Sequence, residues 1–165
     1  MASVSQAVPV PPDLVLLSKG YGGGSALVQL SQTGRSPIQT TALWQDARTL
    51  KTKFSNVTLH DGFIYGLSDG ILECVEAASG HRRWKRGRYG HGQVLGVDRW
   101  LLIQAESGEV ALVEATPQHY REAARFVALE GKTWNNPCLA GSYLLVRNSQ
   151  QAACYRLPLL ASGLQ

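Results

Sequence analysis

Residues 62–77 read GFIYGLSDGILECVEA and residues 100–115 read WLLIQAESGEVALVEA. Aligned at an offset of 38 residues, the two stretches share a glycine near the middle and end in the same tripeptide, Val-Glu-Ala. Looser copies of the pattern occupy residues 142–157 downstream and residues 14–30 upstream. A chain that repeats itself about every 40 residues builds its fold from repeated supersecondary units.

Each copy consists of two apolar runs joined by a tight turn. The dipeptides Asp69-Gly70 and Ser107-Gly108 are typical of a β-hairpin turn when they stand between apolar runs. A short apolar segment precedes each hairpin, and a polar segment with aromatic residues follows it, as in residues 42–45, 83–85 and 120–127. Four short strands in each unit of about 40 residues predict the blade of a β-propeller.

The repeat therefore predicts an all-β fold of about four propeller blades, each a four-stranded antiparallel sheet. A Pro-rich lead-in comes before the blades and a short tail follows them, and the fourth unit lacks a clear outer strand. In chain order, we assign the lead-in to residues 1–12, the blades to residues 13–55, 56–92, 93–130 and 131–158, and the tail to residues 159–165.

One stretch of the third unit fits two structures. Thr116-Pro117 could start a helix over residues 118–129, in which Ala123 and Ala124 are good helix formers. The repeat instead places the outermost strand of the blade in this stretch. We expect the strand, because an outer strand tolerates polar residues.

The composition is that of a folded chain rich in strands and turns. Apolar residues make up 44% of the 165 residues, which excludes a disordered chain. Lys and Arg outnumber Asp and Glu by 16 to 12, which is ordinary for a protein surface. No apolar run approaches the roughly 18 residues that span a bilayer, so we expect no membrane-spanning segment. Residues 1–12 lack the basic start and apolar stretch of a secretory signal peptide.

The cysteines and histidines do not form metal-binding patterns. The cysteines are odd in number and none forms a Cys-x-x-Cys pair, which argues against a disulfide framework and against zinc. Each stands in an apolar run, so we expect burial as small apolar side chains for Cys74, Cys138 and Cys154. The four histidines form neither His-x-His nor His-Glu-x-x-His, so no metal site is predicted.

The second unit resembles a known family in three segments, residues 63–65 (FIY), 69–75 (DGILECV) and 79–84 (SGHRRW). The pattern resembles the pyrroloquinoline-quinone (PQQ)-type propeller repeat, in particular bacterial propellers related to the lipoprotein scaffold of outer-membrane barrel assembly. The resemblance covers about residues 13–158 and implies a periplasmic or other extracytoplasmic location. In this family the tryptophan after Ser-Gly docks between neighbouring blades, a role that the resemblance gives to Trp84, less closely to Trp44, and by substitution to Tyr120.

The number of blades has a consequence for assembly. Members of the family close a ring of about seven or eight blades, whereas this chain holds about four. A half-ring exposes two apolar flanks, and monomers seldom show apolar patches above a few hundred Å². We expect two copies to meet flank to flank as a homodimer with an eight-bladed ring. The alternative is that a separate N-terminal half completes the ring.

Three segments that lead into innermost strands carry a cation, an aromatic residue and an amide each: residues 51–56, 86–93 and 132–137. Propellers bind ligands on such loops at one end of the central channel. The residues predicted to line this channel mouth are Lys53, Asn56, Arg88, His91, Gln93, Lys132, Trp134 and Asn135. Their chemistry suits a carboxylate, a phosphate group or an acidic peptide loop. Alternatively, the amides tie neighbouring loops together, because buried loop backbone must be hydrogen-bonded.

The function indicated is a non-catalytic binding or scaffolding propeller with a protein or peptide partner, because no nucleophile, base or metal cluster stands out. The resemblance adds a quinoprotein dehydrogenase as an alternative, with PQQ and calcium as cofactors. Calcium needs oxygen ligands, and residues 51–56 and 86–93 contain no Asp or Glu, so neither cofactor is expected. A third hypothesis is polyanion or nucleic-acid binding by residues 81–89, which hold five cations. Strand alternation would divide these charges between two faces, so nucleic acid is not the expected partner.

Overall fold

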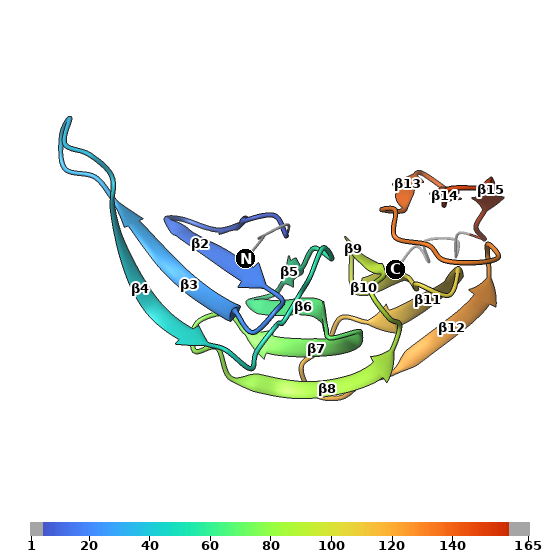
Figure 1. Ribbon diagram of the computed structural model, residues 1–165, viewed down its shortest axis with the longest axis horizontal. Helices are drawn as coiled ribbons and strands as arrows, with labels where there is room; N and C mark the ends of the chain where they lie inside the picture. The colour runs from blue at the N-terminus through green and yellow to red at the C-terminus, as the bar shows by residue number, and fades with distance from the viewer. Residues whose placement is uncertain (1–4, 159–165) are drawn as a thin grey trace, which may run out of the picture.

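The computed structural model describes residues 5–158, and within them the chain forms β-strands and no α-helix. The strands make four consecutive antiparallel sheets that lie side by side in an open arc (Figure 1). The first three sheets have four strands each, and the fourth has three. The predicted all-β class and the four-stranded antiparallel units are therefore confirmed, and the last unit lacks an outer strand within the described residues.

Strand order in every sheet follows chain order, so each sheet is a simple meander. The first sheet contains β1 (Val8–Val10), β2 (Leu14–Lys19), β3 (Gly24–Ser31) and β4 (Gln39–Asp46). The second contains β5 (Thr58–His60), β6 (Phe63–Ser68), β7 (Ile71–Glu76) and β8 (Arg82–Arg88). The third contains β9 (Gln93–Val97), β10 (Trp100–Gln104), β11 (Glu109–Glu114) and β12 (Glu122–Val127). The fourth contains β13 (Cys138–Ala140), β14 (Tyr143–Arg147) and β15 (Ala152–Arg156).

The hairpins of the second sheet form where the turn dipeptides stand. Asp69 and Gly70 both have positive φ, 50° and 80°, between the paired residues Ser68 and Ile71. Two central residues with positive φ define the turn type whose twist matches that of the flanking strands. Asp and Gly tolerate this backbone region better than other residues, which explains why the dipeptide recurs in the sequence.

The outer strands share an irregularity at one register. A β-bulge interrupts pairing with the outer strand after Leu27 in the first sheet, after Cys74 in the second and after Leu112 in the third. The repeat seen in the sequence is thus a repeat of backbone pairing. Glu122–Val127 form the outer strand β12 of the third sheet, so the strand expected there is confirmed and the helix is not formed.

Two expectations about particular segments need correction. Val8–Val10 form β1 and pair with β2, so part of the Pro-rich lead-in is the innermost strand of the first sheet.

Cys74 is buried as expected, and burial raises the pKa of its thiol to about 11. Cys138 and Cys154 are exposed instead, because they lie on the outward face of the last sheet. The tail at residues 159–165 lies outside the described residues.

The core consists of three apolar clusters, one between each pair of neighbouring sheets. Successive side chains of a strand point to opposite faces, so each inner strand serves two interfaces. Ile64 packs toward the first sheet and Tyr65 toward the third. Leu101 and Leu102 likewise divide between the second and fourth sheets. This double use of each sheet explains why the hairpin strands read as continuous apolar runs.

The two ends of the arc show faces that have no neighbouring sheet within the described chain. Leu17 on the first sheet is 47% exposed, whereas its register counterpart Ile103 in the third sheet is fully buried. Leu145 on the fourth sheet is 49% exposed, whereas its counterpart Tyr65 is fully buried. We call these surfaces the first flank and the fourth flank. They expose positions that the middle sheets bury.

Candidate functional site

The loops that lead from one sheet to the next converge around Gln93. The side-chain amide of this buried residue donates to the carbonyl oxygens of Phe54, at 3.3 Å, and Trp134, at 3.0 Å. Its amide oxygen accepts the backbone N–H of Asn56 at 3.3 Å. Gln93 therefore joins three loops, residues 47–57, 89–92 and 128–137, and we call the surface they form the mouth. For Gln93, the loop-tying role considered from the sequence describes the contacts observed.

An aromatic and cationic cluster covers the mouth. The ring of Phe54 lies 5.7 Å from that of His91 and 5.0 Å, edge-on, from that of Trp134. Lys53 Nζ lies 3.2 Å from His91 Nε2, and Lys132 Nζ lies 4.9 Å from the centre of a Trp134 ring. Four of the five residues of this cluster belong to the predicted site, and the fifth is Phe54. A cation above an aromatic face is attracted to it without losing its charge for a ligand.

Glu106 belongs to the same cluster but was absent from the residues predicted. Its carboxylate accepts the indole N–H of Trp134 at 2.8 Å and the backbone N–H of His91 at 2.9 Å. The bond from the His91 backbone, followed by that from Trp134, holds the pKa of Glu106 below its usual value. Glu106 stands in the hairpin turn of the third unit, as Asp69 does in the second, so an acidic residue in the repeated turn was the available signal.

A hollow of about 700 Å³ opens beside this cluster, lined by both acidic and basic side chains. Its three carboxylates bind groups of the chain itself: Asp69 pairs with Lys51, Glu106 binds Trp134 and His91, and Glu109 pairs with Arg125. Arg88 and Lys132 have exposed side chains and no carboxylate partner within residues 5–158. The hollow therefore presents two exposed cations that form no ion pair within the described residues.

The remaining amides of the predicted site contact their own chain. Asn56 accepts the backbone N–H of Gln6 at 3.1 Å through its side-chain oxygen. The amide of Asn135, oriented to satisfy both of its polar atoms, donates to the carbonyl of Arg147 and accepts from its guanidinium. These two side chains therefore fix the loops by contacts within the chain.

The docking tryptophans connect neighbouring sheets. Trp44 donates its indole N–H to the carbonyl of Ala77 at 2.8 Å, and Trp84 donates to that of Thr116 at 2.9 Å. Tyr120 does not take this role in the third sheet. It packs edge-on against Trp84, with ring centres 5.8 Å apart, and its hydroxyl lies 2.7 Å from that of Tyr89, so it contacts the second sheet and not the fourth.

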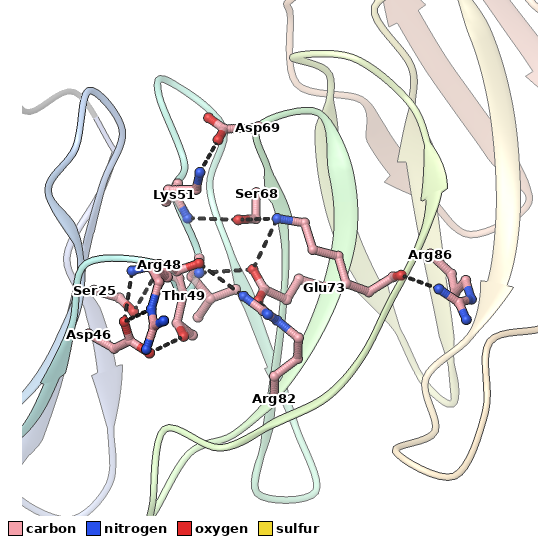
Figure 2. A network of polar contacts seen from close by, with 12 residues as sticks. Ser25, Asp46, Arg48, Thr49, Lys51, Ser68, Asp69, Glu73, Arg82 and Arg86 are labelled. Atoms are coloured by element: carbon pink, nitrogen blue, oxygen red, sulfur yellow. Dashed lines mark hydrogen bonds and ion pairs between the residues drawn. The ribbon is translucent and has the colours of Figure 1, made fainter.

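A buried carboxylate, that of Glu73, binds two of the five cations in residues 81–89 (Figure 2). Glu73 is fully buried, accepts the backbone N–H of Leu50 at 2.9 Å and forms ion pairs with Arg82 and Lys85. Arg82 also donates to the carbonyl of Arg48, which closes the network across the first two sheets. Burial lowers the pKa of Lys85, although Glu73 opposes that effect. Two of the five cations are thus occupied, which weakens the case for a polyanion surface.

The described part of the chain contains no group of three His, Cys, Asp or Glu side chains placed to hold a metal ion. Nor does it contain a helix long and apolar enough to cross a membrane.

Consecutive antiparallel sheets packed face to face in an arc define a β-propeller, here an open part of one. Among solved structures, the chain is similar to BamB from Moraxella catarrhalis, with a TM-score of 0.60 and 13% sequence identity. The match covers 95% of this chain and 59% of that one, so the chain spans less than two thirds of the length of this structural neighbour. This likeness shows the fold. No protein-family model matches the chain, and no curated protein matches it.

Proposed function

We propose that the protein is a non-catalytic propeller scaffold that binds an acidic loop of a partner protein at the mouth. The observation that carries the proposal is the charge distribution of the hollow. Its three carboxylates are bound by the chain's own groups, while Arg88 and Lys132 are exposed and form no ion pair with a carboxylate within the described residues. A carboxylate-bearing loop would meet two cations of different geometry, a planar guanidinium and a flexible ammonium.

The rigidity of the mouth supports binding. Gln93 fixes three loops through hydrogen bonds, and Glu106 holds Trp134 and the backbone of His91 in place. Loops that are already ordered lose little conformational entropy when a partner binds, so more of the interaction energy appears as affinity. The similarity to a propeller fold supports a protein-binding scaffold in general.

We further propose that a second copy of the chain covers the flanks and closes the ring, with a separate half-propeller as the alternative. The first and fourth flanks expose register positions whose counterparts in the middle sheets are fully buried. Light scattering at micromolar concentration should give twice the chain mass of 17.9 kDa. A particle of 17.9 kDa under those conditions would overturn the homodimer.

The residues of the hollow do not fit the calcium and quinone of a dehydrogenase. Calcium takes about six to eight oxygen ligands. The carboxylates of Asp69, Glu106 and Glu109 are each bound by donors of the chain, so they would have to exchange these partners to bind the ion. The donor set therefore supports a binding role without a cofactor.

Binding at the mouth can be tested by fluorescence anisotropy with a labelled Asp/Glu-rich peptide and a matched Asn/Gln peptide. The double variant Arg88→Ala with Lys132→Ala should lower the affinity for the acidic peptide by about ten-fold or more, because two charge-assisted contacts are lost. A control variant, Arg35→Ala with Arg83→Ala, removes the same charge away from the hollow and should change affinity less than about two-fold. Equal affinity of the mouth variant and the unmodified protein would refute the proposed site.

A further inference from the structure

The third sheet has a vacancy at the register where the first two sheets carry a docking indole. Trp44 pairs with Leu27 and Trp84 pairs with Cys74, in each case directly before the bulge. In the third sheet the pair before the bulge is Leu112 with Ala124. A methyl group therefore replaces the indole that would reach from the third sheet to the fourth.

A pocket lies at this position. Its volume is about 280 Å³ and its lining is almost wholly apolar, from residues that include Leu102, Leu112, Ala124, Phe126, Leu144 and Leu157. It continues the apolar cluster between the third and fourth sheets, to which Leu102 and Leu144 also belong. Phe126 forms one aromatic wall and is held edge-on by Tyr155, with ring centres 5.1 Å apart. The pocket is therefore an extension of an existing interface between two sheets.

The hydrogen-bond acceptor of the other two slots has a counterpart here. The carbonyl that receives the Trp44 indole belongs to Ala77, whose own N–H bonds to Gly62 across its hairpin at 2.9 Å. In the fourth sheet the equivalent bond runs from Leu157 to Ser142 at 2.7 Å. Leu157 thus stands at the register of Ala77, and both it and the following Pro158 line the pocket.

We propose that this pocket is a binding site for a small planar aromatic molecule of the indole type. The ring would lie between Ala124 and Leu144 and its N–H would point to the carbonyl of Leu157 or Pro158. The argument is that the two sister slots hold this same chemical group, with an apolar cleft for the ring and a carbonyl for the N–H. Apolar pockets of this kind take up small aromatic molecules when no side chain fills them. The site is separate from the mouth and from the flanks.

The test uses indole as the probe on the full chain, followed by methyl NMR shifts. Saturable shifts should concentrate on Leu102, Leu112 and Leu144, and Ala124→Trp should weaken binding by about ten-fold or more because its own ring fills the slot. The matched control is Ala123→Trp, on the bulge residue of the same strand, which adds the same ring outside the pocket lining and should leave binding within about two-fold.

Three outcomes would overturn the proposal. The first is no saturable binding of indole to the unmodified chain at millimolar concentration. The second is binding that Ala124→Trp leaves unchanged. The third is clear destabilisation of the chain by Ala124→Trp, which would mean that another part of the chain already fills the slot.

Discussion

Replacing Trp84 by alanine should remove a principal connection between the second and third sheets. The indole is half-buried, packs 5.9 Å from the ring of Tyr65 and 5.8 Å from that of Tyr120, and donates to the Thr116 carbonyl at 2.9 Å. Buried Trp-to-Ala changes cost about 3–5 kcal/mol, and partial exposure places Trp84 at the lower end of that range. The lost hydrogen bond is included at about 1 kcal/mol. We expect the free energy of unfolding to fall by about 3–4 kcal/mol.

Urea denaturation followed by circular dichroism measures this loss, provided that the slope with denaturant is unchanged. Trp84→Phe keeps most of the ring but not the N–H, and should lose about 1–2 kcal/mol, which separates packing from the hydrogen bond. Trp134→Ala, at a 46% exposed side chain, should cost about 1 kcal/mol. A loss below about 1 kcal/mol for Trp84→Ala would refute the docking role inferred from the geometry.

Other substitutions address charge and assembly. Glu73→Ala removes the buried acceptor of the Leu50 backbone N–H and the ion-pair partner of Arg82 and Lys85, so it should lower the unfolding free energy by about 1–3 kcal/mol in the same urea assay, and a change within error would contradict the proposed network. Arg125 is the chief cause that lowers the pKa of Glu122 from 4.5 to about 2. The ionised carboxylate therefore contributes fully to stability above pH 4.5, and this contribution is lost as the pH falls through about 2. Thermal unfolding measured across this pH range should show the loss, and Glu122→Gln should flatten the pH dependence. If the flanks bind a second copy, Leu17→Lys with Leu145→Lys should give a folded particle of 17.9 kDa by light scattering, and a retained dimer would place the interface elsewhere.

The repeat was readable from the sequence because its determinants are local. Asp69-Gly70 adopts the turn that two positive φ values require, and apolar runs on both sides supply strands whose opposite faces are both buried. The cations of the mouth could also be predicted from the sequence, because loops that precede the inner strand of each sheet lie at the same end of the arc. Lys53, His91, Lys132 and Trp134 meet for that reason.

Other features depend on contacts between sheets, which spacing does not reveal. Tyr120 was expected in the docking position, but the bulge sets the register and places Ala124 there. Glu106 joins the mouth only because its turn lies against two loops distant in sequence, the one with His91 before the third sheet and the one with Trp134 after it. The exposure of Cys138 and Cys154 follows from their being in the last sheet, since Cys154 has the register of the buried Cys74. An apolar run predicts a strand, but both faces of that strand are buried only where a further sheet packs against each of them.

The three junctions between neighbouring sheets differ in the contacts that stabilise them, and the junction between the third and fourth sheets is the weakest. The first junction has the Trp44 indole and the hydrogen bonds from the Leu50 backbone to Glu73 and from Arg82 to the Arg48 carbonyl, and the second has Trp84. The third lacks the indole at Ala124 and keeps the hydroxyl of Tyr155, which donates to the Ala128 carbonyl at 2.7 Å. Under a stretching force applied to its two ends, the chain should release its last sheet as the earliest step, well before the other junctions separate.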